Sequence, residues 1–385
     1  MQRAFIDTKN KNYSAYSLNN NNFGYKILNK ICNNDTCLSA PVSLYYLLQL
    51  IYIGCSGKSR DELAQVLNQT TDNDVSIISE FMKEINKDSH GESGLHLTNG
   101  IFIDNKHRDS IIKSHYNVLM KKLGQIDYLD FSKIQSIDKI NKFFKKVTHN
   151  LVENVLTIDD VDSTTSLILI NTIYFKRDWV HKFELTEYKQ PFTNLRGQTT
   201  FLPTMNKTAH YDYYENEKLQ IISLKYIGDT YAMDIFLPIG FGKGNLEHVI
   251  QEFQNYDLNT ILINLEIDCI LPVFTQRVHL NMVDILKELG VEHIFDPQLS
   301  DFTNTGVKSL YVSKIIQDIA IIVDTNGTEA SGQTTAVMKS RDFEINKIFK
   351  ADHSFLYQIR NLKNGLILFN GIFDGFIDKY SFINN

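Results

Sequence analysis

The chain has 385 residues, a formal net charge of −6 and a hydrophobic fraction of 43%, which is enough apolar material for a large core. The mild acidity argues against nucleic acid as the main partner. The longest apolar run, Leu44–Gly54, contains Gln49 and is too short to cross a bilayer.

The N-terminal segment Met1–Tyr13 is polar and lacks the apolar core of a cleavable signal. This leaves two localisations open, the cytoplasm and export by a route that needs no such signal, and an extracellular target is compatible with the second. The cysteines form no Cys-x-x-Cys pair and no framework spacing, so free thiols are predicted at Cys32, Cys37, Cys55 and Cys269.

Helical periodicity dominates the first third of the chain. Ser43–Gly54 is nearly all apolar, which predicts a central, buried helix. A second helix is predicted to open at Lys58–Leu63, with Ser59 as its N-cap and Glu62 three residues later. Asp74–Lys87 is predicted to form an amphipathic helix. A further helical stripe of apolar residues contains Ile137, Ile140, Phe144, Val147 and Leu151.

Strand patterns take over further along the chain. Most are continuous runs of β-branched and aromatic residues, typical of strands that are buried on both faces. Helices early and strands later predict a mixed α+β fold with large sheets. The predicted strands are Thr165–Tyr174, Leu219–Lys225, Tyr231–Leu237, Cys269–Phe274, Ser313–Val323, Ser354–Ile359 and Leu366–Phe373.

The chain contains no complete motif for catalysis, nucleotide binding or metal binding. Gly54–Ser59 ends like a phosphate loop, but its first glycine is misplaced and an apolar helix precedes it where a strand is required. His107-Arg108-Asp109 resembles a kinase catalytic loop that lacks the required Asn. No nucleophile is paired with a base, so no enzyme activity, metal or cofactor is expected. Three isolated histidines are predicted to be surface or locally hydrogen-bonded side chains: His279, His293 and His353.

In the segment Gly327–Arg341, the even-numbered and odd-numbered positions carry different kinds of residue. Its even positions are small or uncharged, whereas its odd positions include the charged Glu329, Lys339 and Arg341. Because strand side chains alternate between faces, this pattern predicts a half-buried strand, although the Gly, Ser, Thr and Ala content is typical of a loop. We interpret the segment as a switch between the two states, which ends where Asp342 would point a charge inward. The even positions are Thr328, Ala330, Gly332, Thr334, Ala336, Met338 and Ser340.

Four motifs resemble those of the serpin family, and they occur in the family's order between about Tyr13 and Phe373. Trp179, the only Trp of the chain, falls on the Trp of the first motif. The chain therefore resembles a serpin, of the ovalbumin-like type that lacks a cleavable signal. The motifs are Asn171–Phe183, Leu286–Phe302, Gly327–Ala330 at the hinge of the reactive loop, and Phe349–Phe355.

The resemblance implies a single domain over residues 1–385, with three β-sheets, eight or nine helices, an exposed reactive-centre loop at about 326–347 and a short tail at 374–385. It also implies irreversible inhibition of a serine protease. The protease takes the loop as a substrate, the hinge inserts into the main sheet as a new strand, and the acyl-enzyme is distorted before deacylation. The hinge residues would be Gly327, Thr328, Glu329, Ala330, Ser331, Gly332, Gln333 and Thr334.

Family spacing from the hinge glycine places the reactive bond between Arg341 and Asp342. An arginine at this position suits a trypsin-like protease, whose pocket carries a carboxylate at its base. Asp342 is expected to narrow the list of targets, and Lys339 is a second, weaker bait. The alternative, that Arg341 is an incidental exposed loop residue, stays open.

The resemblance also assigns a region in which the main sheet must part, containing Asn171, Trp179, Ser43 and Gln317. The family's usual Lys and Glu at the top of this sheet are replaced by Val273 and Thr325, so both charges are lost together. Three further departures are expected near the opening, and they leave open how readily the sheet parts: Gln317 for His, Ala40 for Ser and Ser354 for Pro.

The expected partner is a trypsin-like serine protease, bound covalently by a monomeric inhibitor. Asp74–Lys87 mixes acidic and basic side chains without a basic stripe, so heparin activation is not expected there. An alternative of another class is a non-inhibitory serpin that acts as a carrier, storage or chaperone protein. Such members tend to carry bulky or charged hinge residues, which this chain lacks. A merely flexible loop at 327–341 is the structural alternative to a switch.

Overall fold

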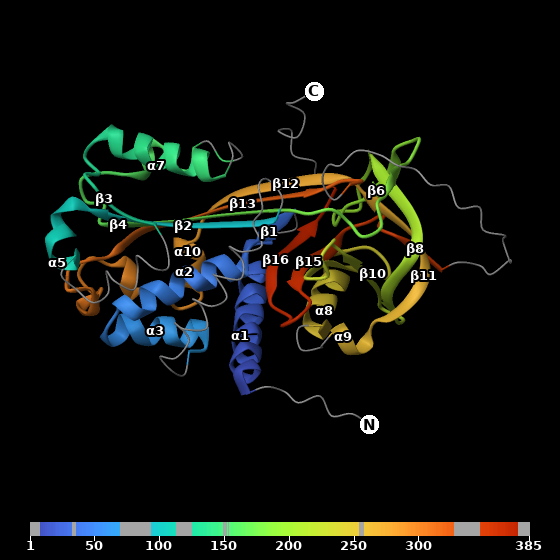
Figure 1. Cartoon of the computed structure of the whole chain (residues 1–385), viewed down its shortest axis with the longest axis horizontal. Coiled ribbons are helices and arrows are strands. Elements are labelled where there is room, and N and C mark those ends of the chain that lie inside the picture. Colours follow the sequence, from blue (N-terminus) through green and yellow to red (C-terminus); the bar gives the residue numbers. More distant parts are fainter. Residues whose placement is uncertain are drawn as a thin grey trace. The chain divides into compact units, whose positions relative to one another are not determined.

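The computed structural model describes residues 8–32, 36–69, 94–112, 125–148, 152, 154–253, 258–326 and 347–375 (Figure 1). The chain forms two compact units, and each is assembled from three separate stretches of sequence. The first comprises residues 1–30, 40–175 and 277–320, and the second comprises 31–39, 176–276 and 321–385. The single domain over 1–385 stays a prediction.

The first unit is built on a five-stranded sheet in the order β12-β13-β4-β2-β3. Its central strands β4 and β13 are hydrogen-bonded neighbours, and nine of the ten residues of β4 are buried. Both are predicted from the sequence to within two residues, because continuous buried runs carry the strand signal without help from tertiary context. The bounds are β12 (Phe274–Asn281), β13 (Val312–Val323), β4 (Leu167–Lys176), β2 (Gly94–Asp104) and β3 (Gln125–Leu129).

Helices cover both faces of this sheet (Figure 1). α7 (Ile134–Val147) lies on one face, and the core beneath it includes Ile140, Phe144 and Ile168, each no more than 1% exposed. α2 (Pro41–Gly54) lies on the opposite face with α3 (Gly57–Leu67), and its apolar residues other than Ile53 are buried, as predicted. The unit also contains most of α1 (Thr8–Ile31), together with α5 (Arg108–Ile112), α10 (Val283–Glu288), η1 (Asn105–His107), η2 (Ile158–Asp160), η3 (His293–Phe295) and η4 (Thr303–Thr305).

The predicted N-cap of α3 is wrong. Ser56 stands at the N-cap, whereas Ser59 lies inside the first turn, where its buried hydroxyl accepts the Asp301 N–H at 3.0 Å. The helix therefore begins two residues before the predicted cap, and the serine that suggested a cap instead fastens α3 to a distant turn.

Glu62 also serves a long-range contact and does not close a capping box. Its carboxylate accepts the N–H groups of Glu292 and His293, both at 2.8 Å, and its other oxygen lies 2.5 Å from His293 Nδ1. Both side chains are largely buried, with 13% and 14% of their surface exposed. Glu62 therefore joins α3 to η3.

We expect Glu62 to make the stability of the protein sensitive to acid. Burial alone raises the pKa of its carboxyl, but the N–H groups of His293 and Glu292 and the His293 ring outweigh burial and lower it. A lowered folded-state pKa contributes stability above the unfolded pKa of about 4.3, and this stability is lost as the pH falls below that value. Urea titrations between about pH 5 and 3 should show a flatter pH dependence of the free energy of unfolding in Glu62→Gln. Parallel curves for variant and parent would contradict this assignment.

The second unit is built on a nine-stranded sheet in the order β1-β16-β15-β10-β9-β8-β11-β14, with β5 paired to β8. A two-stranded sheet, β6-β7, and the helices α8 and α9 complete it. The α+β class is confirmed. The bounds are β1 (Cys37–Ser39), β16 (Ile367–Phe373), β15 (Phe355–Asn361), β10 (Tyr231–Pro238), β9 (Leu219–Lys225), β8 (Thr204–Glu215), β11 (Ile263–Pro272), β14 (Lys347–Lys350), β5 (Glu184–Leu185), β6 (Gln190–Thr193), β7 (Thr199–Leu202), α8 (Lys243–Phe253) and α9 (Leu258–Ile261).

The predicted strand Cys269–Phe274 is two strands. β11 ends at Pro272 and β12 begins at Phe274, so Val273 separates the two strands. The Val273 N–H donates to the Pro203 carbonyl at 2.9 Å. The apolar run continues through the break because residues on both sides of it are buried. The hydrophobic run therefore indicates that these residues are buried, but it does not show where one strand ends and the next begins.

The prediction of four free thiols is wrong for two of them. Cys32 and Cys37 form a disulfide with their Cα atoms 5.4 Å apart. Cys55 and Cys269 are free, as predicted. Both are buried, and burial raises the pKa of both thiols. Within the described ranges, none of the helices combines the length and the apolar character that a bilayer crossing requires.

Candidate functional site

The candidate site is the seam between β4 and β13, together with the segment that follows β13. β13 ends at Val323, and Asp324–Asn326 then lead directly into Gly327. The predicted hinge, Gly327–Thr334, and the predicted reactive bond, Arg341–Asp342, lie outside the described residues, as do Asp74–Lys87 and the end of the tail. The roles assigned to them therefore stay predictions.

Trp179 holds the segment Asp324–Asn326 that precedes Gly327. Its indole Nε1–H donates to the Asp324 carbonyl at 2.9 Å, and its backbone N–H donates to the Asn326 carbonyl at 3.1 Å. The N–H of Phe183 donates to the carbonyl of Thr325 at 2.9 Å. Trp179 is itself only 1% exposed and stacks on Tyr226, with the ring centroids 4.3 Å apart. Three consecutive carbonyls before Gly327 are thus held by buried groups.

A buried polar cluster crosses the seam. The Gln317 amide on β13 donates to the Ala40 carbonyl at 3.0 Å and to the Ser43 hydroxyl at 3.2 Å, and it lies 3.5 Å from Asn171 Oδ1 on β4. The Asn171 amide donates to Asn99 Oδ1 on β2 at 2.6 Å. Gln317, Ser43 and Asn171 are completely buried. The cluster therefore joins three adjacent strands to the first turn of α2.

Two buried polar atoms of this cluster lack a partner within the part of the chain that the structure describes. Gln317 Oε1 and Asn99 Nδ2 are buried, and neither has a hydrogen-bond partner among the described residues. An unsatisfied buried polar group costs about 1–3 kcal/mol.

Three of the four residues assigned to sheet opening lie together, and the fourth does not. Ser43, Asn171 and Gln317 form the cluster at the seam, whereas Trp179 belongs to the second unit and holds the Asp324 carbonyl. Asn99 is a member of the cluster that the sequence analysis missed, since an Asn on a strand carries no local signal for a partner 72 residues away.

Comparison with known proteins identifies the fold and the family. A family model described as serpin (serine protease inhibitor) matches residues 18–374. The chain belongs to the serpin family. An uncharacterised serpin-like protein of Acanthamoeba polyphaga mimivirus is 30% identical over 372 residues, covering 92% of this chain and 88% of the relative. Human glia-derived nexin is 26% identical over 374 residues, covering 91% of each chain.

Solved serpin structures agree with this fold. Native protease nexin-1, crystallised with heparin, superposes with a TM-score of 0.79 at 24% identity, covering 94% of this chain and 99% of its own. Maspin superposes with a TM-score of 0.83 at 22% identity, with the same coverage. At these identities the likeness concerns the fold alone. The absence of heparin activation in this serpin stays a prediction.

Several departures of this serpin from the family pattern are placed by the structure. The Val273 N–H donates a hydrogen bond to the Pro203 carbonyl, and the Thr325 carbonyl accepts one from the Phe183 N–H. Ser354 lies before β15 in the second unit, where its hydroxyl donates to Asp374 Oδ1 and its N–H donates to the Thr193 carbonyl. Its predicted place near the opening of the main sheet stays a prediction.

Two of the three isolated histidines of this serpin, His279 and His353, are locally hydrogen-bonded, as predicted. His279 Nδ1 lies 3.3 Å from Asp318, and His293 pairs with Glu62. His353 Nε2 lies 2.8 Å from the Pro238 carbonyl. In the described ranges, no three His, Cys, Asp or Glu side chains are arranged to hold a metal ion.

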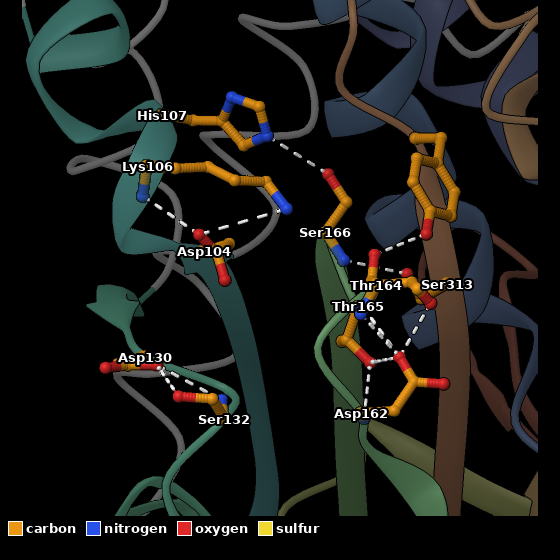
Figure 2. Close-up of polar contacts among 11 residues, drawn as sticks. Asp104, Lys106, His107, Asp130, Ser132, Asp162, Thr164, Thr165, Ser166 and Ser313 are labelled. Carbon is orange, nitrogen blue, oxygen red and sulfur yellow. Dashed lines mark hydrogen bonds and ion pairs between the residues drawn. The ribbon is translucent and has the colours of Figure 1, made fainter.

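The contact between Ser166 and His107 resembles part of a catalytic triad, but the nearby Asp104 carboxylate is not directed to the histidine. His107 Nε2 lies 3.3 Å from the hydroxyl of Ser166, which is 1% exposed at the start of β4. Burial, reinforced by Lys106, lowers the pKa of His107 against the opposing charge of Asp104. The Asp104 carboxylate accepts the Lys106 N–H at 2.9 Å and is directed to that residue (Figure 2). The contact thus serves the packing at the end of the sheet.

Proposed function

We propose that this serpin is an irreversible, suicide-substrate inhibitor of trypsin-like serine proteases. In this proposal the reactive bond is Arg341–Asp342, and residues 327–341 insert between β4 and β13 after cleavage. The observation that carries the proposal is the alternation in 327–341, whose even positions are small or uncharged, in the stretch of sequence that follows β13, one of the two strands of this seam.

The topology supports insertion at this place. A segment that turns back after β13 through a short connection forms an antiparallel hairpin with it. Its new neighbours would be β13 and β4, whose side chains already meet through Gln317 and Asn171. Residues 327–341 number 15 and extend to about 50 Å as a strand, whereas the 12 residues of β13 span about 40 Å. Insertion therefore carries Arg341 beyond the far end of the seam.

The chemistry balances as an interrupted hydrolysis. The protease serine attacks the Arg341 carbonyl carbon, and its proton passes through the protease histidine to the leaving amine of Asp342. An ester then joins the protease serine to Arg341. Insertion competes with attack by water on this ester, and trapping results when insertion is faster.

Incubation with trypsin tests the proposal. The parent should form an adduct that survives SDS, and Arg341→Ala should lose it. Lys339→Ala is the matched control, and it should keep the adduct because it leaves the reactive bond unchanged. Loop cleavage without an adduct, and without a rise in the thermal stability of the cleaved form, would favour a non-inhibitory serpin.

A further inference from the structure

The inference concerns the foot of the seam, at the end of β13 opposite to Gly327. Here β13 begins at Val312 and β4 begins at Leu167, and the connector 157–166 leads into β4. All of these residues belong to the first unit. A strand that inserts from the Gly327 end would reach this place last.

Three contacts fasten the connector to the start of β13. The Ser166 N–H donates to the Ser313 hydroxyl at 2.9 Å. The Tyr311 hydroxyl donates to the Thr164 carbonyl. Lys314 Nζ lies 2.7 Å from Asp160 Oδ1, and these two side chains are only 24% and 22% exposed. Each contact crosses from the β13 side of the seam to the β4 side.

The connector is preorganised to make these contacts. The Thr157 and Asp160 side chains form a capping box around η2. Asp162 accepts the N–H groups of Thr164 and Thr165, at 2.8 and 3.0 Å (Figure 2). These short turns hold the partners of Lys314 and Tyr311 in place, so that the three contacts do not depend on ordering a flexible loop.

The two sides of these contacts belong to different parts of the sheet. The Ser166 carbonyl accepts the Asp104 N–H at 2.9 Å, which ties the connector to β2 as well as to β4. A cavity of about 300 Å³ borders the contacts, and its lining includes Asp159, Thr164, Tyr311 and Lys314. Open space therefore lies beside these side chains.

We propose that Ser166–Ser313, Thr164–Tyr311 and Asp160–Lys314 form a clasp that opens late in insertion and sets the fraction of encounters that end in a trapped protease. The inference rests on the proposed function. While the clasp is closed, the last part of the inserting strand cannot enter between β4 and β13. A larger fraction of the acyl-enzyme is then hydrolysed before insertion is complete. The same clasp slows insertion of the uncleaved loop, so it preserves the active form before a protease arrives.

Separate Lys314→Met and Asp160→Asn variants, with Tyr311→Phe as a third, test the clasp. Each should lower the moles of inhibitor consumed per mole of trypsin trapped, and shorten the half-life of the active uncleaved form about two- to fivefold, as expected for loss of one partly exposed contact. The Lys314→Met/Asp160→Asn double variant should match the single variants, because they remove the same ion pair. Lys314→Arg should retain the parental values.

Lys139→Met is the matched control, since the Lys139–Asp127 pair joins α7 to β3 and does not cross the seam. It should leave both quantities unchanged. Equal effects of Lys139→Met and Lys314→Met would overturn the clasp.

Hydrogen exchange separates this inference from the proposed function. If the parent traps no trypsin, the proposed function fails, and the clasp is then judged by the exchange rate of the Ser166 amide in the uncleaved protein. Faster exchange in Lys314→Met and Tyr311→Phe than in Lys139→Met supports a clasp that holds the seam. Unchanged exchange, together with unchanged trapping where trapping occurs, overturns it.

Discussion

Thr328→Arg is expected to convert the protein from an inhibitor of trypsin into a substrate. Residue 328 lies on the inward parity of the proposed inserting strand, so insertion would place a guanidinium in the sheet without a partner. Burial of an unpaired polar or charged group costs about 1–3 kcal/mol or more, and each 1.36 kcal/mol slows a step about tenfold. Insertion should then lose to deacylation. Gel analysis should show cleaved inhibitor as the main product and the SDS-stable adduct as a minor one.

Glu329→Arg is the matched control for this prediction. It introduces the same side chain one residue later, on the parity that stays in solvent. Adduct formation should therefore remain close to that of the parent. Equal loss of adduct in both variants would show that the alternation does not decide which side chains are buried, and the argument from parity would fall.

The strands that are predictable from the sequence are those whose neighbours contribute little to the signal. β4, β9, β10, β13, β15 and β16 are predicted to within two residues, because uninterrupted β-branched and aromatic runs favour a buried strand in any surroundings. β8 is missed. Its 12 residues alternate between buried and exposed positions and include Asn206, Lys207 and Asp212, so it is a strand because β9 and β11 pair with it.

α1 is missed for the same reason as β8. Its sequence is rich in Asn and has weak helical propensity, and Tyr16, Phe23 and Leu28 are buried on the folded protein. Tertiary packing therefore decides this helix. The Cys32–Cys37 disulfide was missed because the spacing of the two residues does not show that they approach to 5.4 Å.

The candidate site also contains residues that the sequence identifies and contacts that only the structure shows. The resemblance identifies Ser43, Asn171 and Gln317, because family motifs mark single positions, and the structure shows that they share one cluster. The contacts at the foot of the seam carry no motif. Lys314 and Asp160 are 154 residues apart, and only the topology brings them within 2.7 Å.

Asp234 is the sharpest case of a residue that the strand pattern leaves unexplained. It is completely buried in β10, inside an otherwise apolar run. The register places it opposite Ser223 on β9 and Gln358 on β15. Its carboxylate accepts Arg360 Nε–H at 2.6 Å, the Ser223 hydroxyl at 2.6 Å and the Gln358 amide at 3.1 Å. The Arg360 side chain is only 5% exposed, so each charge depends on the other.

Asp234→Ala is expected to lower the free energy of unfolding by about 3–5 kcal/mol, because it leaves the Arg360 guanidinium buried without its carboxylate. Urea titration followed by circular dichroism measures this loss. Glu288→Ala breaks the Lys30–Glu288 pair, whose side chains are 39% and 61% exposed, and it should cost about 0–1 kcal/mol. Asp234→Leu combined with Arg360→Met should cost less than Asp234→Ala, since no unpaired charge remains. If the double variant instead costs more than Asp234→Ala, the ion pair itself contributes net stability, and the unpaired charge is not the main cause of the loss.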